Sequence, residues 1–127
     1  IRNCLVGSEM CIRDSQRDLV KHIEGFVSEY PSVLLAKQPS SIIAHNIFGF
    51  INSSGNPGLA TAGTGDVLSG MVTAFIAQGY NLVESSYIST YIHGYVADKM
   101  SKRISERGLI ASDLLMGIAS NLSKYES

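Results

Sequence analysis

The chain has 127 residues, of which 45% are hydrophobic and 17% charged, and its formal net charge is -1. This composition excludes an intrinsically disordered chain and a strongly basic nucleic-acid-binding surface. No apolar run approaches the length needed to cross a bilayer. We therefore expect one globular unit of the cytoplasm that binds neither nucleic acid nor membrane.

The first fifteen residues differ from the rest of the chain. They do not begin with Met and show no sustained period of 2 or 3.6. Residues 4–15 resemble a translated sequencing adaptor, and the alternative is a short native strand followed by a turn. We expect residues 1–15 to be a non-native leader ahead of native residues 16–127, so that Cys4 and Cys11 carry no information about redox compartment.

The next segments alternate between a helix and short strands. An apolar stripe predicts a helix from Gln16, capped by Asp14 or Ser15 and stopped by Pro31. The continuous apolar run 32–36 predicts a strand buried on both faces. Residues 41–44 and 47–52 are expected to form two more strands, joined by a turn at His45-Asn46. The helical stripe consists of Leu19, Val20, Ile23, Phe26, Val27 and Tyr30.

The C-terminal half reads as three helices. A stripe from Val67 to Ile76 predicts a helix with Gly79 at its C-terminal end. Asn81 and Glu84 have the spacing of a capping box and start a long helix that ends near Arg103. Ser112 is expected to cap a last helix, with its inner face formed by Leu114, Leu115, Ile118 and Leu122.

A glycine-rich loop leads directly into the first of these helices. Five of the twelve glycines fall between residues 55 and 70. The unpaired N–H groups and the dipole at a helix start favour an anion, and Gly63, Thr64 and Gly65 would let those N–H groups converge on a phosphate. The dinucleotide fingerprint and the P-loop are excluded, because Leu68 replaces the third glycine and Thr64 replaces the lysine.

Asp66 allows two interpretations. A carboxylate in the first helical turn is favoured by the helix dipole and needs no further role. A carboxylate beside a bound phosphate is repelled by it, however, which favours a function such as accepting a proton from an attacking hydroxyl. The residues alone do not decide between these two roles.

The stretch 54–70, SGNPGLATAGTGDVLSG, resembles the signature of the ADP/ATP-dependent NAD(P)H-hydrate dehydratases of the ribokinase-like superfamily. The GTGD core occurs across that superfamily, whereas the flanking GNPGLAT and VLSG are more specific. YIHG at 91–94 and GLIASDL at 108–114 also resemble family positions. The resemblance covers about residues 17–122 and implies the C-terminal fragment of an α/β, ribokinase-like three-layer sandwich.

The resemblance implies a metabolite-repair reaction on hydrated NADH or NADPH. ADP or ATP, with Mg²⁺, would phosphorylate the ring hydroxyl, and phosphate would then be eliminated. Asp66 would be the catalytic base and contact the substrate. Gly63, Thr64 and Gly65 would form the anion hole, with Gly65 also touching the nucleotide. No metal-ligand cluster is visible in the sequence.

A second nucleotide element of the family reads approximately Lys-Gly-Ala-x-Thr after a buried strand. The matching positions are Lys37, Gln38, Pro39, Ser40 and Ser41. Gln38 adds a Cβ where glycine is usual, and Pro39 removes an N–H. We expect these five residues to bind nucleotide, and the alternative is a turn with a solvated lysine.

Other candidates are open to simpler interpretations. His93 is a ligand or a helix-packing histidine, and Asn56 contacts nucleotide or sets the Asn-Pro turn. His22 and His45 are expected to be solvated. Two rival functions remain, a small-metabolite kinase of the hydroxyethylthiazole type and an inactive nucleotide-binding fragment. The longer parent protein is expected to be a homo-oligomer.

Overall fold

The computed structural model describes residues 16–38, 40–46 and 48–123. Helix α2 (Gln16–Glu29) precedes the strands β1 (Val33–Ala36), β2 (Ile42–His45) and β3 (Phe48–Ile51). A 3-10 turn, η1 (Pro57–Ala60), then leads to α3 (Thr64–Ala77), α4 (Leu82–Ile104) and α5 (Ala111–Leu122). The predicted leader, both cysteines and the proposed caps of α2 lie outside the described residues.

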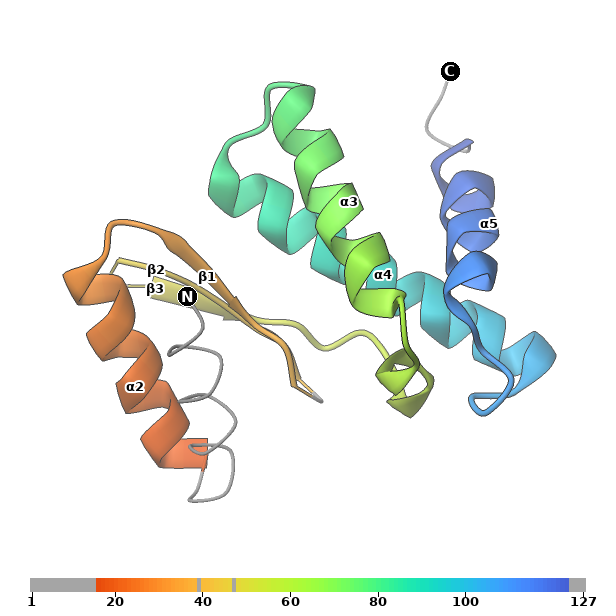
Figure 1. The fold of residues 1–127 in the computed structure, drawn as a ribbon, viewed down its shortest axis with the longest axis horizontal. Helices are drawn as coiled ribbons and strands as arrows, with labels where there is room; N and C mark the ends of the chain where they lie inside the picture. The colour runs from red at the N-terminus through yellow and green to blue at the C-terminus, as the bar shows by residue number, and fades with distance from the viewer. Residues whose placement is uncertain (1–15, 39, 47, 124–127) are drawn as a thin grey trace.

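The three strands form an antiparallel sheet in the order β1-β2-β3. Helix α2 packs on one face of this sheet, and the helices α3 to α5 lie on its other side (Figure 1). The adjacent residues Ile43 and Ala44 of β2 are both buried, and neighbouring strand residues point to opposite faces. Both faces of β2 are therefore covered, as in the predicted α/β sandwich.

Two apolar cores hold these layers. Leu19, Ile23 and Val27 of α2 pack with Ala44 of the sheet. The second core joins α3, α4 and α5 with the loop before α5, and its buried members are Val67, Val96, Ala97, Leu109, Leu114 and Ile118. None of the helices in the described ranges is long and apolar enough to cross a bilayer.

Several local predictions are confirmed. The side chain of Asn81 accepts from the Glu84 N–H (2.9 Å), and the Glu84 carboxylate accepts from the Asn81 N–H (3.3 Å), so the capping box forms. Gly79 follows α3 with a φ of 96°, and its N–H donates to Ile76 at 3.0 Å. This left-handed conformation favours glycine and ends the helix.

Other predictions are wrong because tertiary packing decides them. Strand β1 is only half-buried, and β2 is the strand covered on both sides. Leu115 is 57% exposed, since the inner face of α5 uses Leu114 and Ile118. Helix α5 is capped two residues before Ser112, where the Asp113 carboxylate accepts from the Ile110 N–H (3.0 Å).

Some polar and apolar side chains also depart from their expected exposure. Val20 of α2 and Tyr30, which directly follows that helix, are both exposed. His45 is half-buried in β2, with Nδ1 3.3 Å from the Ser32 carbonyl oxygen, rather than solvated in a turn. His22 is exposed, as predicted, and its Nδ1 lies near the Asp18 carbonyl.

Candidate functional site

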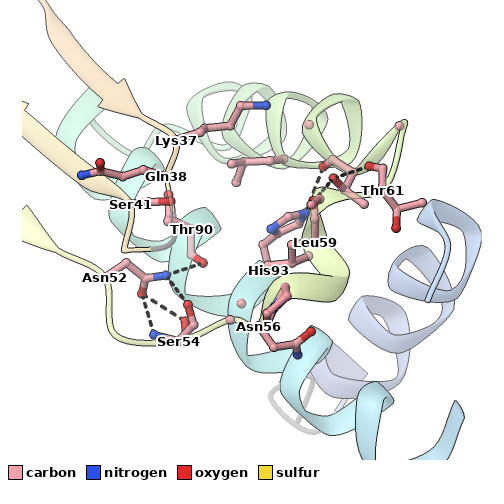
Figure 2. A pocket seen from close by; sticks show the side chains of 18 of the residues that line it. Lys37, Gln38, Ser41, Asn52, Ser54, Asn56, Leu59, Thr61, Thr90 and His93 are labelled. Carbon is pink, nitrogen blue, oxygen red and sulfur yellow. Dashed lines mark hydrogen bonds between the residues drawn. The ribbon is translucent and has the colours of Figure 1, made fainter. Parts of the chain in front are cut away.

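A cleft of about 800 Å³ lies where the sheet, the glycine-rich loop and α4 meet. Its volume is in the range of small-molecule sites. Three separate stretches line it, namely the turn after β1, the loop from Asn52 to α3, and residues 90, 93 and 94 of α4 (Figure 2). Elements far apart in sequence thus share one cavity.

The loop before α3 is held by its own side chains. The Thr61 hydroxyl donates to the Gly58 carbonyl (2.9 Å), and the Thr64 hydroxyl lies 2.7 Å from the Leu59 carbonyl oxygen and 2.9 Å from that of Thr61. Thr64 is 5% exposed. Its hydroxyl is therefore engaged within the loop, and its backbone N–H, which makes a long hydrogen bond to the Thr61 carbonyl (3.4 Å), is the one group that Thr64 can turn toward an anion.

The first turn of α3 is the part of the chain in which the sequence predicts an anion site. Gly63 has a φ of 86°, which favours glycine, and its carbonyl accepts from the N–H groups of Asp66 and Val67, both at 3.1 Å. Among the described residues, no backbone carbonyl accepts from the Gly65 N–H. This N–H is available at the positive end of the helix dipole.

Lys37 joins this helix start from the other side of the cleft. A Cβ placed on Gly65 would collide with the Lys37 Nζ atom, so the ammonium lies directly against Gly65. Figure 2 shows the side chain extending from the end of β1 toward α3. The ammonium and the Gly65 N–H thus place positive charge and a free donor at one point, as a phosphate requires.

Only some of the other residues in the turn after β1 line the cleft. Gln38 and Ser41 line the cleft beside Lys37, whereas Ser40 is exposed and does not line it. Pro39 lies outside the described residues. The fold therefore brings three of the five predicted nucleotide-binding residues to the cleft.

Asp66 lies next to Gly65 in the first turn of α3 and lines the cleft. It is exposed, and no hydrogen bond within the described part of the chain uses its carboxylate. An unpaired carboxylate beside the anion position is able to accept a proton from a bound hydroxyl.

His93 of α4 forms the floor of the same site. It is 6% exposed, and its Nε2 donates to the Thr64 carbonyl at 3.0 Å. Burial lowers the pKa of His93; the hydrogen bond to Thr64 opposes this, and the Lys37 ammonium adds to the lowering. The ring is therefore kept neutral, and it packs between helices while also lining the cleft.

Asn56 and Asp98 form a clamp on the loop. Asn56 Oδ1 accepts from the Gly58 N–H (3.0 Å), and its Nδ2 donates to Asp98 Oδ1 (2.9 Å). The second Asp98 oxygen accepts from the Gly55 N–H at 2.9 Å. These contacts support the turn-setting interpretation of Asn56. Sequence reasoning missed Asp98, which carries no local motif and acts on a loop distant in sequence.

The close approach of the loop to α4 was also missed. A Cβ on Gly94 would lie 2.6 Å from the carbonyl carbon and oxygen of Ser54, so only glycine fits there. The Ser54 hydroxyl lies 3.0 Å from the Tyr91 carbonyl oxygen. A glycine inside a long helix is unfavourable by about 1 kcal/mol relative to alanine. The presence of Gly94 in the middle of the predicted helix was therefore the sequence signal for a close approach of another segment.

No group of three or more His, Cys, Asp or Glu side chains within the described ranges could hold a metal ion. Among the residues that the structure describes, Asp66 is the one carboxylate that lines the cleft. The side chains in the described ranges therefore do not fit a resident metal site.

The α/β layers and the helix start at the cleft are those of a protein of the ribokinase-like kind. A solved ribokinase-like superfamily protein from Enterococcus faecalis aligns with a TM-score of 0.75 and 25% identity, over 89% of this chain and 38% of that one. The ADP/ATP-dependent NAD(P)H-hydrate dehydratase from Bacillus subtilis, co-crystallized with ATP/Mg²⁺, aligns with a TM-score of 0.79. At 22% identity, over 87% of this chain and 40% of that one, it shows the shared fold.

The chain belongs to the NAD(P)H-hydrate dehydratase family, whose profile matches residues 5–119. The bifunctional NAD(P)H-hydrate repair enzyme Nnr of Coxiella burnetii is 35% identical over 100 residues, covering 78% of this chain and 20% of that protein. The ADP-dependent (S)-NAD(P)H-hydrate dehydratase of Neisseria meningitidis is 44% identical over 68 residues, covering 54% and 22%. The chain thus spans about a fifth of the length of these relatives.

Proposed function

We propose that this chain is the C-terminal, nucleotide-binding part of an enzyme that dehydrates hydrated NADH or NADPH at the expense of ADP or ATP. The observation that carries the proposal is the contact between Lys37 and Gly65. It joins the two stretches that resemble the family's nucleotide elements into one cationic, donor-rich point, with Asp66 beside it.

The proposed chemistry uses the cleft in two steps. The ring hydroxyl of the substrate attacks the terminal phosphorus of the nucleotide, Asp66 accepts the hydroxyl proton, and AMP or ADP leaves. The N–H groups of Gly63, Thr64 and Gly65, with the Lys37 ammonium, stabilise negative charge on the transferred phosphoryl group. Phosphate then leaves with the C–O electron pair, and loss of a ring C–H proton to water restores the double bond.

The other assignments are parts of the same proposal. Gln38, Ser41 and Gly65 contact the nucleotide with Lys37, Mg²⁺ accompanies the nucleotide, and Asp66 also binds the hydrated cofactor. The complete protein is proposed to be cytoplasmic and homo-oligomeric. Residues 1–15 are proposed to be non-native, although the family match begins within them at residue 5, and reading the upstream gene sequence tests this.

The test is the substitution Asp66→Asn in the complete protein that carries this chain. We expect it to abolish conversion of hydrated NADH, followed by absorbance, while ADP affinity measured by calorimetry stays within a few-fold. The control is Asp113→Asn, which removes a carboxylate from the first turn of α5, outside the cleft. This control is expected to retain turnover. Turnover retained in Asp66→Asn would refute the base assignment.

Two measurements separate the rival functions. In ³¹P spectra of the reaction, a dehydratase releases inorganic phosphate, whereas a hydroxyethylthiazole-type kinase leaves a phosphate monoester on its product. Calorimetric titration with ADP tests the third function. ADP binding without any turnover in the complete protein would show an inactive nucleotide-binding module instead of an enzyme.

A further inference from the structure

His93 is a buried titratable side chain that the proposed mechanism does not use. It lies on α4, with a relative exposure of 6%, and lines the cleft. Within the described residues, its one polar contact is the hydrogen bond from Nε2 to the Thr64 carbonyl oxygen, at 3.0 Å (Figure 2).

The direction of this hydrogen bond follows from its acceptor. A carbonyl oxygen cannot donate, so Nε2 carries the proton. Burial disfavours the imidazolium, and the Lys37 ammonium adds to that effect. His93 is therefore a neutral ring with its donor fixed on the ε nitrogen and directed at the first residue of α3.

The acceptor is half of the peptide group that forms the anion site. The Thr64 C=O and the Gly65 N–H belong to one planar trans peptide, so they point in opposite directions. A donor that holds the carbonyl also orients the N–H. It polarises the peptide as well, which strengthens the N–H as a donor.

The N–H side of this peptide, at Gly65, lies next to the Lys37 ammonium. No backbone carbonyl in the described part of the chain accepts from the Gly65 N–H, and the Lys37 Nζ atom lies against the same residue. The neutral His93 ring thus binds the carbonyl end of the peptide, while the Gly65 N–H at its other end lies beside the Lys37 ammonium.

We propose that His93 is a positioning residue of the anion site, which orients and polarises the Thr64–Gly65 peptide so that the Gly65 N–H binds the nucleotide phosphate. The phosphate identity rests on the proposed function, whereas the orientation of the peptide does not. A histidine that merely fills space between helices would affect stability without affecting this N–H.

The experiment compares three forms of the full chain, the unaltered protein, His93→Phe and His93→Gln. Phenylalanine fills similar volume without a donor, whereas the glutamine amide places a donor near the Nε2 position. Two readouts are taken, the ¹⁵N chemical shift of the Gly65 amide without ligand and the ADP affinity by calorimetry. His93→Met, with a flexible side chain and no donor, replaces His93→Phe if that variant does not fold.

In His93→Phe we expect the Gly65 ¹⁵N resonance to move and the ADP affinity to fall about tenfold. In His93→Gln we expect the resonance to return to its original position and the affinity to return to within about threefold of that of the unaltered protein. An unmoved Gly65 resonance in His93→Phe overturns the proposal. Equal losses in His93→Gln and His93→Phe overturn it too, because the donor would then be irrelevant. If the unaltered chain binds no ADP, the proposed function fails, and the Gly65 resonance alone still decides the role of His93.

Discussion

Gly65→Ala is a change that separates folding from binding at the candidate site. Gly65 lies in the first turn of α3 in a backbone conformation that does not require glycine, so the added methyl group is compatible with the helix. The Cβ would overlap the Lys37 Nζ atom. That atom is the end of a flexible side chain, and the ammonium is expected to move instead of the backbone.

The size of the effect follows from Coulomb's law. An ammonium 4 Å from a phosphate charge contributes about 4 kcal/mol at an effective dielectric of 20 and about 1 kcal/mol in bulk water. Withdrawal to about 7 Å removes a little under half of this, or about 0.4 to 1.8 kcal/mol. Because Lys37 is solvent-exposed, we expect the middle of this range, a loss of about fivefold in ADP affinity.

Stability is expected to change in the opposite direction. Replacing glycine by alanine in a helix lowers the entropy of the unfolded chain and stabilises the fold by up to about 1 kcal/mol. Urea unfolding measures this term, and calorimetry with ADP measures the binding loss. The matched control is Gly70→Ala on the same helix, where a Cβ meets nothing within 4 Å. It should give the gain in stability without the loss of affinity.

A third variant tests whether the loss of ADP affinity in Gly65→Ala is caused by displacement of Lys37. In a Lys37→Met background, Gly65→Ala should cost little further affinity, because the ammonium it displaces is already absent. The reasoning is refuted if Gly65→Ala binds ADP as tightly as the unaltered chain, or if it lowers the free energy of unfolding by more than about 1 kcal/mol.

Two further predictions concern α4. Asp98→Asn replaces one of the two carboxylate oxygens that accept from Gly55 and Asn56 by an amide donor, and should lower the free energy of unfolding in urea by about 1 to 3 kcal/mol. The exposed Glu106→Gln is the control, and equal small effects would contradict the clamp. Because the pKa of His93 is lowered in the fold, the unfolded chain binds its proton first as the pH falls below 6.5. Stability should therefore be full above pH 6.5 and should fall below it, by up to about 1.36 kcal/mol per pH unit from this group, whereas His93→Gln should lack that component.

Local elements were predictable because their causes lie within a few residues. The apolar period places α2 and α3, and the Asn81–Glu84 capping box starts α4 through contacts three residues apart. The glycine-rich loop leading into a helix start likewise indicates an anion site without any tertiary information. The resemblance carried by residues 54–70 then pointed to the correct family.

The predictions that are wrong concern burial, which depends on elements distant in sequence. Nothing local distinguishes Leu115, which is exposed, from Leu114, which is buried, because the direction of the inner face of α5 depends on where α4 lies. The run 32–36 is continuously apolar, yet only β2 has both faces covered, since coverage is a property of the neighbouring layers.

By itself, the sequence predicted the class of site, a helix-start anion site with Asp66 beside it, and the family resemblance predicted that Lys37 would contact the same nucleotide. Only the tertiary structure decided that the Lys37 ammonium lies against Gly65, that His93 donates to the Thr64 carbonyl, and that Asp98 holds the loop. The physical reason is that hydrogen bonds and charge contacts act over a few ångströms. Residues separated by a strand or a helix are brought that close only by the packing of the layers between them.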